Sequence, residues 1–437
     1  MEGRLPNPHR RFIDTCVYVL RYCGVWPLQP SAHILLKILH FIFRTFNYVV
    51  MAIHLASILA PAIYHKGDLV VLGDVGGWFI GGSMSFLKFV KFTVSYNSII
   101  DHIEKVLIPI DILQQSSDRG MVINIKSYSQ QENMEIKLFT SACGFLVLAT
   151  IFFGLRQKPG LLIKALYPFE TDHSPIYEIV AFIQIYSESY FFAIIIATDG
   201  MVIALIRWTT IHFTALAANY KNCNSKLIKR ATIVSINETW ELANQYNSSK
   251  LSPEDLEIKS FVAFEKHESE NSVDDFNWRY KTCIKHHQRL LKLTIDVNIT
   301  INLLLLLQFS ASLTIVCLCG FQIILNLNNS FRVMQFAVFV LIALGELFVF
   351  CWYGNEFTHV TNSLTYNQWS SGWEYINDST NSDKKQKLHN LITITMLQTM
   401  HPIEFKAVGL FVLSTATFLS VVKSSYSVLA LLMNMND

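Results

Sequence analysis

Charged residues are scarce in this chain: they make up 16% of its 437 residues, whereas 51% are hydrophobic. Soluble domains carry about a quarter charged residues, so this is not the balance of a soluble protein. The formal charge of +2 is too small to indicate nucleic-acid binding. The sequence also lacks His-Glu-x-x-His, Gly-x-Ser-x-Gly and glycine-rich phosphate-binding motifs. We therefore expect no enzymatic activity, no catalytic residue, no cofactor and no metal site.

Long apolar runs are what the sequence contains instead. A run of about 20 apolar residues is long enough to cross ~30 Å of hydrocarbon as a helix. Such runs predict an all-α, polytopic membrane protein with seven transmembrane helices, at 38–64, 69–96, 137–155, 178–206, 297–325, 333–353 and 406–433. We find no cleavable signal peptide, so the first crossing is expected to direct insertion itself.

The crossings divide the chain into a sequence of membrane and polar segments. We expect an N-terminal segment (1–37), crossings one to four (38–206), a polar segment (207–296), crossings five and six (297–353), a second polar segment (354–405) and the last crossing (406–437). The stretch from Lys221 to Lys292 is rich in Asn, Ser, Glu and Lys. It shows no core-forming pattern of its own.

The distribution of lysine and arginine predicts the orientation. With a cytoplasmic N-terminus, 29 of these residues fall on the cytoplasmic side and five, such as Lys66 and Arg332, fall outside. Long loops count less under the positive-inside rule, but without the thirteen from Arg207 to Lys292 the ratio is still 16 to five. We predict a cytoplasmic N-terminus and an extracellular C-terminus.

This orientation is the reverse of that of a G-protein-coupled receptor, the usual seven-helix protein. The Asp/Glu-Arg-Tyr and Asn-Pro-x-x-Tyr motifs are absent, and no cysteine falls in a predicted outer loop. Asn328 is the glycosylation sequon predicted to lie outside, whereas Asn237, Asn247 and Asn377 would be cytoplasmic. A receptor of that kind without its own conductance stays as the alternative. A solute transporter is disfavoured, because paired broken helices are not found in two matching halves.

The last crossing carries a row of hydroxyl groups. At 100° per residue, its polar side chains and one leucine fall within roughly a 100° arc: Thr417, Ser420, Ser424, Ser427, Leu431 and Asn434. Small hydroxyl residues also mediate helix packing, so the row indicates either a packed face or the wall of a wet pathway. In the second case, Leu431 is an apolar constriction near the outer exit. Lys423, beside the arc, has three readings: snorkelling to the interface, pairing with a neighbouring chain, or lining the pathway.

Carboxylates also occur within the predicted crossings, where charge is costly and usually faces an interior or a water-filled cavity. They are Asp74, Glu188, Asp199 and Glu346. Glu188 and Asp199 are eleven residues apart, which places them within about 20° on one helix face. Each of these two carboxylates is either a structural group with its charge satisfied by a partner or a functional group.

Several stretches resemble the insect odorant receptor family. They are "LYPFETDHSPIYEIVAFIQIY" before and within the fourth crossing, "CIKHHQRLLKL" before the fifth, "FCWYGNEFTHVTNSLTYNQWSSGWEY" after the sixth, "TMLQTMHPIEFKAVGLF", and "STATFLSVVKSSYSVLALL" in the seventh. Their order and spacing together carry the resemblance, which is strongest after Tyr167. The Thr-Tyr and Gln-Phe pattern of the related gustatory receptors is not found in the last helix, and a gustatory receptor channel stays as a further alternative.

The resemblance implies a ligand-gated, non-selective cation channel subunit in the plasma membrane of sensory-neuron dendrites. It implies a volatile organic odorant as ligand and a heterotetramer with the odorant-receptor co-receptor, in which the polar segments form the main subunit contact. The hydroxyl row would then line the pore, with Leu431 at the gate, Asn434 one turn further out and Met435 beside it. The family's odorant pocket lies among helices two, three, four and six, where the candidates by position are Trp78, Phe79, Phe152, Phe153, Tyr186, Tyr190, Phe336 and Phe339.

Overall fold

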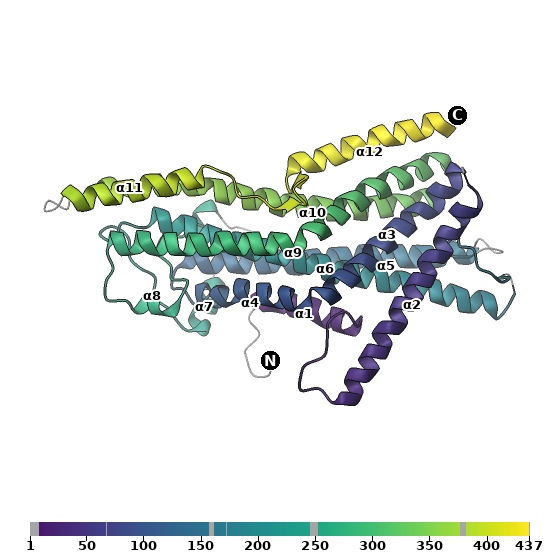
Figure 1. Ribbon diagram of the computed structural model, residues 1–437, viewed down its shortest axis with the longest axis horizontal. Helices are drawn as coiled ribbons and strands as arrows, with labels where there is room; N and C mark the ends of the chain where they lie inside the picture. Colours follow the sequence, from purple (N-terminus) through teal and green to yellow (C-terminus); the bar gives the residue numbers. More distant parts are fainter. Residues whose placement is uncertain are drawn as a thin grey trace.

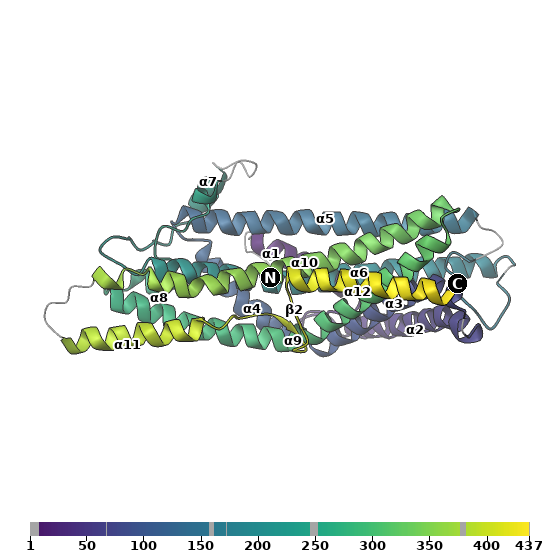
Figure 2. The same cartoon turned by 90° about the horizontal axis from the view of Figure 1, so that it is seen from above.

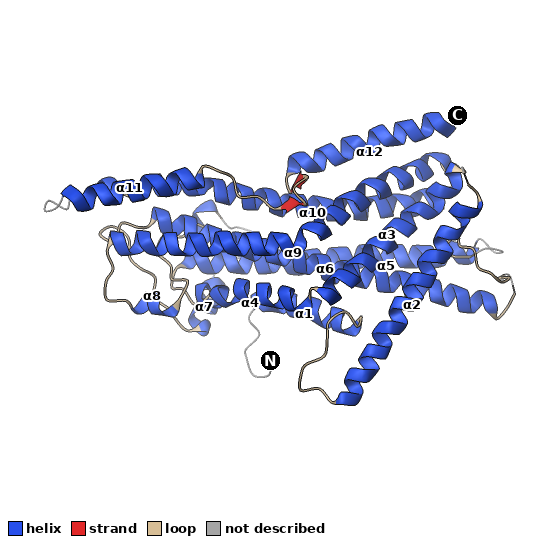
Figure 3. Ribbon diagram, viewed as in Figure 1, coloured by secondary structure: helices blue, strands red, loops and turns tan. Residues whose placement is uncertain are grey.

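The computed structural model describes residues 8–66, 68–156, 161–171, 173–244, 252–375 and 382–436. Almost all of its regular structure is helical (Figure 3). The helices, in chain order, are α1 (Pro8–Tyr22), α2 (Ile34–Tyr64), α3 (Leu69–Val94), α4 (Tyr96–Leu113), α5 (Arg119–Arg156), α6 (Ile176–Lys221), α7 (Ile236–Asn244), α8 (Lys266–Glu270), α9 (Phe276–Leu325), α10 (Ser330–Trp369), α11 (Ser382–Thr399) and α12 (Thr415–Asn436). Two short strands, β1 (Lys406–Ala407) and β2 (Phe411–Val412), pair antiparallel just before α12.

Seven of these helices are long and apolar enough to cross a membrane, as the sequence predicted. They are α2, α3, α5, α6, α9, α10 and α12. Their outward side chains are apolar: on α2, for example, Leu36, Phe41 and Phe46 are all exposed. A surface of this kind is stable against hydrocarbon and not against water. The protein is a multi-pass membrane protein with a mainly helical fold.

Four helices, α5, α6, α9 and α10, extend well beyond the predicted crossings, whereas α12 begins only at Thr415 because the start of the predicted last crossing forms β1 and β2. α9 has 50 residues and α6 has 46, so at 1.5 Å per residue they reach about 75 Å and about 70 Å, more than twice the hydrocarbon thickness. The predicted polar segments at 207–296 and 354–405 are therefore partly continuations of α6, α9 and α10. The molecule is elongated, and α8 and α11 lie at the end opposite the C-terminus (Figure 1).

The stretch from Lys221 to Lys292 does contribute to the core, which corrects the expectation drawn from its composition. Phe261 and Phe264 are among the most completely buried side chains of the protein. The segment is held by buried amides: Asn219 accepts from the Val262 backbone N–H at 2.7 Å and donates to the Val262 carbonyl at 2.7 Å. Arg279 donates to the carbonyls of Asn222 and Ile228. These contacts have no helical or strand periodicity, so the sequence pattern does not reveal them.

Two helices mark the extremes of burial. α6 is mostly buried, because this helix is apolar on every side and contacts α1, α3, α5, α9 and α10. α12 is mostly exposed and lies on the outer surface of the bundle (Figures 1 and 2). The centre of the bundle and the surface of α12 are the two places where the sequence predicted function.

Candidate functional site

A cavity lies around the middle of α6, between α3, α5, α9 and α10. The space between its lining atoms, counted to its open mouth, is about 910 Å³. Its walls are mainly aromatic and aliphatic, and Phe191, Phe192 and Ile195 of α6 form one side. On α3, Gly81 lets the ring of Phe339 approach: a β-carbon at that position would lie 3.3 Å from Phe339 Cζ.

The predicted ligand-binding aromatics are placed in several environments. Trp78 and Phe339 line the cavity, and their rings lie 5.0 Å apart. Phe336 is buried in the same apolar cluster without lining the cavity, and Phe79 is half-buried beside it. Phe152 is 49% exposed and lines neither this cavity nor the smaller one next to it, and the side chain of Phe153 lies outside the described residues.

Tyr186 and Tyr190 face a different part of the bundle. The Tyr186 hydroxyl donates to Asn47 Oδ1 of α2 at 2.6 Å, and the Tyr190 hydroxyl donates to the Cys23 carbonyl just after α1. Their rings stack with centroids 5.9 Å apart. Both side chains therefore join α6 to α1 and α2, away from the cavity lining, and a role in ligand binding stays a prediction for them.

Sequence reasoning missed most of the cavity wall on α6. Phe191, Phe192, Ile195 and Ile196 line the cavity, but α6 is apolar all round and offers no stripe that would distinguish these positions. The usable signal was the pair of carboxylates. Glu188 and Asp199 both line the cavity, in agreement with their spacing of eleven residues along the helix.

A smaller cavity adjoins the main one and shares Trp78, Glu188 and Phe192 with it. Its wall includes Ile163, from the connection between α5 and α6. The side chain of Gln184 holds that connection in place, because it accepts from the Ile163 N–H at 3.2 Å and donates to the Ile163 carbonyl at 3.0 Å. Gln184 is fully buried, so this pair of hydrogen bonds replaces both partners that water would have supplied.

Charged groups meet at one side of the main cavity. The Lys88 ammonium of α3 donates to both Asp199 oxygens at 2.6 Å and to Gln308 Oε1 of α9 at 2.8 Å. Glu346 of α10 lies 3.9 Å from the same ammonium. Lys88 is fully buried within the bundle, so it does not belong among the loop residues counted for the orientation; the excess on the predicted cytoplasmic side persists without it.

The other intramembrane carboxylates also have partners. Glu188 lies 3.1 Å from His54 Nε2 of α2. Asp74 lies within 4.0 Å of Lys164 and 3.9 Å of Arg332. These contacts satisfy the charges locally.

A second buried ionic cluster joins α5, α6 and α10 beside the cavity. Arg207 is fully buried, lies 3.3 Å from Glu132 and donates to Glu135 at 2.5 Å. The Tyr353 hydroxyl donates to the other oxygen of Glu135 at 2.5 Å, and the guanidinium carbon lies 4.2 Å from the centroid of the Tyr353 ring. Glu135 also lines the cavity, so this cluster connects the cavity wall to α10.

The hydroxyl row of α12 points away from the rest of the helix bundle. Ser420, Ser424, Ser427 and Asn434 are exposed, Leu431 is 58% exposed and Thr417 is half-buried. The other face packs: Leu429 approaches Gly320 of α9, the Ser425 carbonyl accepts from Cys317 Sγ, and the rings of Phe418 and Phe348 lie 5.5 Å apart. Lys423 is exposed next to the row, and the side chain of Met435 lies outside the described residues.

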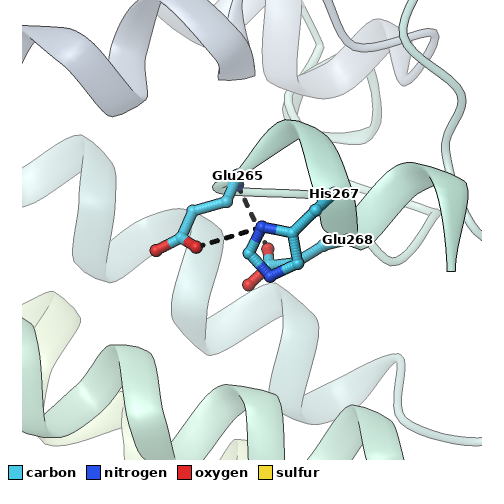
Figure 4. A group of neighbouring side chains, drawn as sticks. All are labelled: Glu265, His267 and Glu268. Carbon is cyan, nitrogen blue, oxygen red and sulfur yellow. Dashed lines mark hydrogen bonds and ion pairs between the residues drawn. The ribbon is translucent and has the colours of Figure 1, made fainter.

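Glu265, His267 and Glu268 bring three possible metal-ligand atoms within 4.8 Å of one another (Figure 4). Their carboxylates already serve other groups. Glu265 accepts from Arg289 at 2.8 Å, and Glu268 contacts His286 Nε2 at 2.5 Å and accepts from the Phe264 N–H at 2.9 Å. Burial alone would raise the pKa of Glu268, but these hydrogen bonds outweigh it and lower that pKa. The group is a helix cap braced against α9, and we assign it no metal.

The asparagine predicted as a glycosylation site, Asn328, lies in the turn between α9 and α10 and is exposed. Asn237 lies in α7, and Asn247 and Asn377 lie outside the described residues. The α9–α10 turn is at the same end of the molecule as the C-terminus (Figure 1). An asparagine in an exposed turn is sterically available for modification.

The apolar spans and the central cavity define a multi-pass helical membrane protein with an internal cavity. A sequence model of the family described as 7tm Odorant receptor matches residues 72–426. Because this range covers most of the chain, the protein belongs to the 7tm odorant receptor family. The resemblance expected from the motifs is confirmed.

Individual relatives agree with this assignment. Odorant receptor 94a of Drosophila melanogaster is 24% identical over 39% of this chain, and Odorant receptor 33b of the same organism is 28% identical over 35%. The chain spans less than half the length of these relatives, 43% and 38% respectively. In fold, the chain is similar to the insect olfactory receptor OR5 from Machilis hrabei, with a TM-score of 0.71 at 13% identity and 97% of each chain covered. The structure of that receptor in complex with eugenol gives a TM-score of 0.68, with 97% of this chain and 98% of that chain covered.

Proposed function

We propose that the protein is an odorant-gated, non-selective cation channel subunit of the plasma membrane of sensory-neuron dendrites. A volatile organic ligand binds in the cavity around α6, and α12 lines a pore shared with other subunits. The assembly is a heterotetramer with the odorant-receptor co-receptor. The N-terminus is cytoplasmic and the C-terminus extracellular.

The observation that carries this proposal is the orientation of the hydroxyl row on α12. A membrane helix that only packs would turn its small polar residues toward its own bundle. Here Ser420, Ser424 and Ser427 face outward, while apolar residues such as Leu429 face α9. Water in a pore at the axis of several subunits would give this outward row of hydroxyls a polar environment.

The lining of the cavity supports the proposed kind of ligand. It is enclosed by aromatic and aliphatic side chains, as expected for a site that takes an apolar organic molecule. The fold is similar to that of a receptor whose structure was determined with eugenol, a small organic molecule.

The far end of the molecule supports assembly. Ile394 and Leu397 on α11, and Met400 just after it, are large, apolar and exposed. Apolar side chains outside the membrane-spanning region favour a protein partner, and subunits of the same tetramer are the partner we propose for the segments at 207–296 and 354–405.

The function is tested by recording current from cells that express the chain with and without the co-receptor, against a broad odorant panel. We expect negligible current from the chain alone and odorant-evoked cation current with the partner. Antibody access to tagged termini in unpermeabilised cells tests the orientation at the same time. Second-messenger signalling without direct conductance, or a cytoplasmic C-terminus, would reject the proposal.

The pore is tested on α12 itself. Cysteines at Ser424, Ser427 and Leu431 should react with a water-soluble thiol reagent and lose current, whereas cysteines at Val422 and Leu429 should be silent. The Leu431→Ser variant should raise basal current, because a hydroxyl lets water persist where an apolar ring excludes it. Equal responses from both cysteine sets would mean that the row packs against a neighbour and does not conduct.

A further inference from the structure

Glu346 combines deep burial, a place on the cavity wall and an incomplete set of hydrogen bonds. Its side chain comes from α10 and lines the cavity around α6. The residue is 8% exposed, so water does not solvate the carboxyl group freely. In the part of the chain that the structure describes, its Oε1 atom has no hydrogen-bond partner.

The nearest cation, Lys88, does not supply the missing hydrogen bond to Glu346. Lys88 has three N–H donors, and they are directed to the two Asp199 oxygens and to Gln308. The Lys88 ammonium is 3.9 Å from Glu346 Oε1, which is within reach of charge attraction but too long for a hydrogen bond. One ammonium thus serves two carboxyl groups, Asp199 with hydrogen bonds and Glu346 without.

A buried acceptor without a donor raises the free energy of the empty receptor, and a ligand that brings a donor removes that cost. Glu346 Oε1 is an acceptor when the carboxylate is ionised, and also when the group carries a proton on its other oxygen. The Glu346 side chain lines the cavity, so a ligand bound there would bring its donor next to this carboxyl group. Ile342 and Ala343 of the same helix also line the cavity and add apolar surface to this wall.

We propose that Glu346 determines ligand specificity by accepting a hydrogen bond from the ligand's head group. The ligand is an apolar molecule with one hydrogen-bond donor, a hydroxyl or an amine. This inference rests on the proposed function, since it assigns the chemistry of the odorant that the cavity binds.

The negative charge of the cavity wall disfavours ligands that carry a carboxylate. Four carboxyl groups line the cavity: Glu135, Glu188, Asp199 and Glu346. The cations beside them, Lys88 and Arg207, are already engaged by two carboxylates each. A ligand carboxylate would meet like charge in a place of low dielectric, so it binds more weakly than a donor of the same length.

The test compares a straight-chain alcohol, amine, methyl ether and carboxylate of equal length by dose–response of odorant-evoked current. We expect the alcohol and the amine to act at about tenfold lower concentration than the ether, because one hydrogen bond to a buried acceptor contributes about that factor in affinity. The carboxylate should be the weakest of the four ligands. Glu346→Leu should abolish the preference for alcohol over ether. Glu346→Gln should keep that preference, because its amide oxygen is still an acceptor, and should weaken the response to the amine.

Ile342→Leu is the matched control, since it changes the same wall on the same helix without a polar group. It should shift all the ligands alike. Thermal stabilisation of the purified receptor by each ligand gives a second measurement that does not require conduction. If no ligand evokes current but the alcohol stabilises the protein more than the ether, the channel function fails and the assignment of Glu346 stands. Equal potency and equal stabilisation by alcohol and ether, or an alcohol preference that persists in Glu346→Leu, would overturn the assignment.

Discussion

Replacing Lys88 with methionine should destabilise the protein far more than replacing its closest partner, Asp199, with asparagine. In the native bundle one buried ammonium faces two buried carboxyl groups, Asp199 at 2.6 Å and Glu346 at 3.9 Å. Lys88→Met leaves both carboxyl groups without their cation. Asp199→Asn leaves Lys88 with Glu346, a balanced pair.

The distances give the size of the difference. At an effective dielectric constant of about 20, the gross attraction of two unit charges is about 6 kcal/mol at 2.6 Å and about 4 kcal/mol at 3.9 Å. The pair of Lys88 with Glu346, which remains when Asp199 loses its charge, is therefore about two thirds as strong as the pair that is lost. Removing one partner of a buried pair costs about 3–5 kcal/mol when the remaining charge is uncompensated. We expect that full cost for Lys88→Met and about half of it for Asp199→Asn.

The double variant Lys88→Met with Asp199→Asn should be more stable than Lys88→Met alone, because a single remaining carboxyl group can stay protonated and neutral. The assay is the temperature at which detergent-solubilised receptor loses its monodisperse chromatographic peak. Lys105→Met is the control: its ion pair with Asp101 is 2.5 Å long but about half exposed, so solvent screens it and its loss should change the stability little. Equal destabilisation by Lys88→Met and Asp199→Asn, or strictly additive effects in the double variant, would refute this reasoning.

Three further predictions follow from close contacts and clamps. Gly81→Val should raise the concentration of large odorants needed for activation, because the added side chain displaces the Phe339 ring into the cavity. Gly144→Val is the control: a β-carbon at that position has nothing within 4 Å, so dose–response curves should not change. Gly354→Ala should lower the free energy of unfolding by about 1–3 kcal/mol and reduce evoked current, because its β-carbon would lie 2.5 Å from the Leu413 carbonyl oxygen just before α12. Gly345→Ala on the same helix should have only a small effect on stability. Gln184→Leu should speed tryptic cleavage after Lys164 by releasing the Ile163 backbone, and Gln335→Leu, which removes a hydrogen bond to the Thr150 side chain alone, should not.

The sequence was sufficient where a property depends on local composition and period. A run of about 20 apolar residues spans a bilayer whatever its neighbours are, so the seven spanning helices were predictable. The arc of hydroxyls from Thr417 to Asn434 follows from helix geometry alone, as does the shared face of Glu188 and Asp199. The helices of the polar segments were not predictable in this way, because buried side chains such as Asn219 and Arg279 order them through contacts with distant backbone.

The cavity and its charges were decided by tertiary structure. α6 is apolar on every side, so its sequence alone does not show whether Tyr190 or Phe191 faces the ligand; packing against α1 and α2 turns Tyr190 to the Cys23 carbonyl and leaves Phe191 on the wall. From the sequence, Lys88 was counted as a cytoplasmic loop residue. In the structure it is a buried ion-pair partner, because α6 and α10 bring Asp199 and Glu346 to it from 111 and 258 residues away in the chain. Helix periodicity gives the direction of a side chain relative to its own helix axis. Which neighbour it meets depends on how the helices pack, and that is a property of the whole bundle.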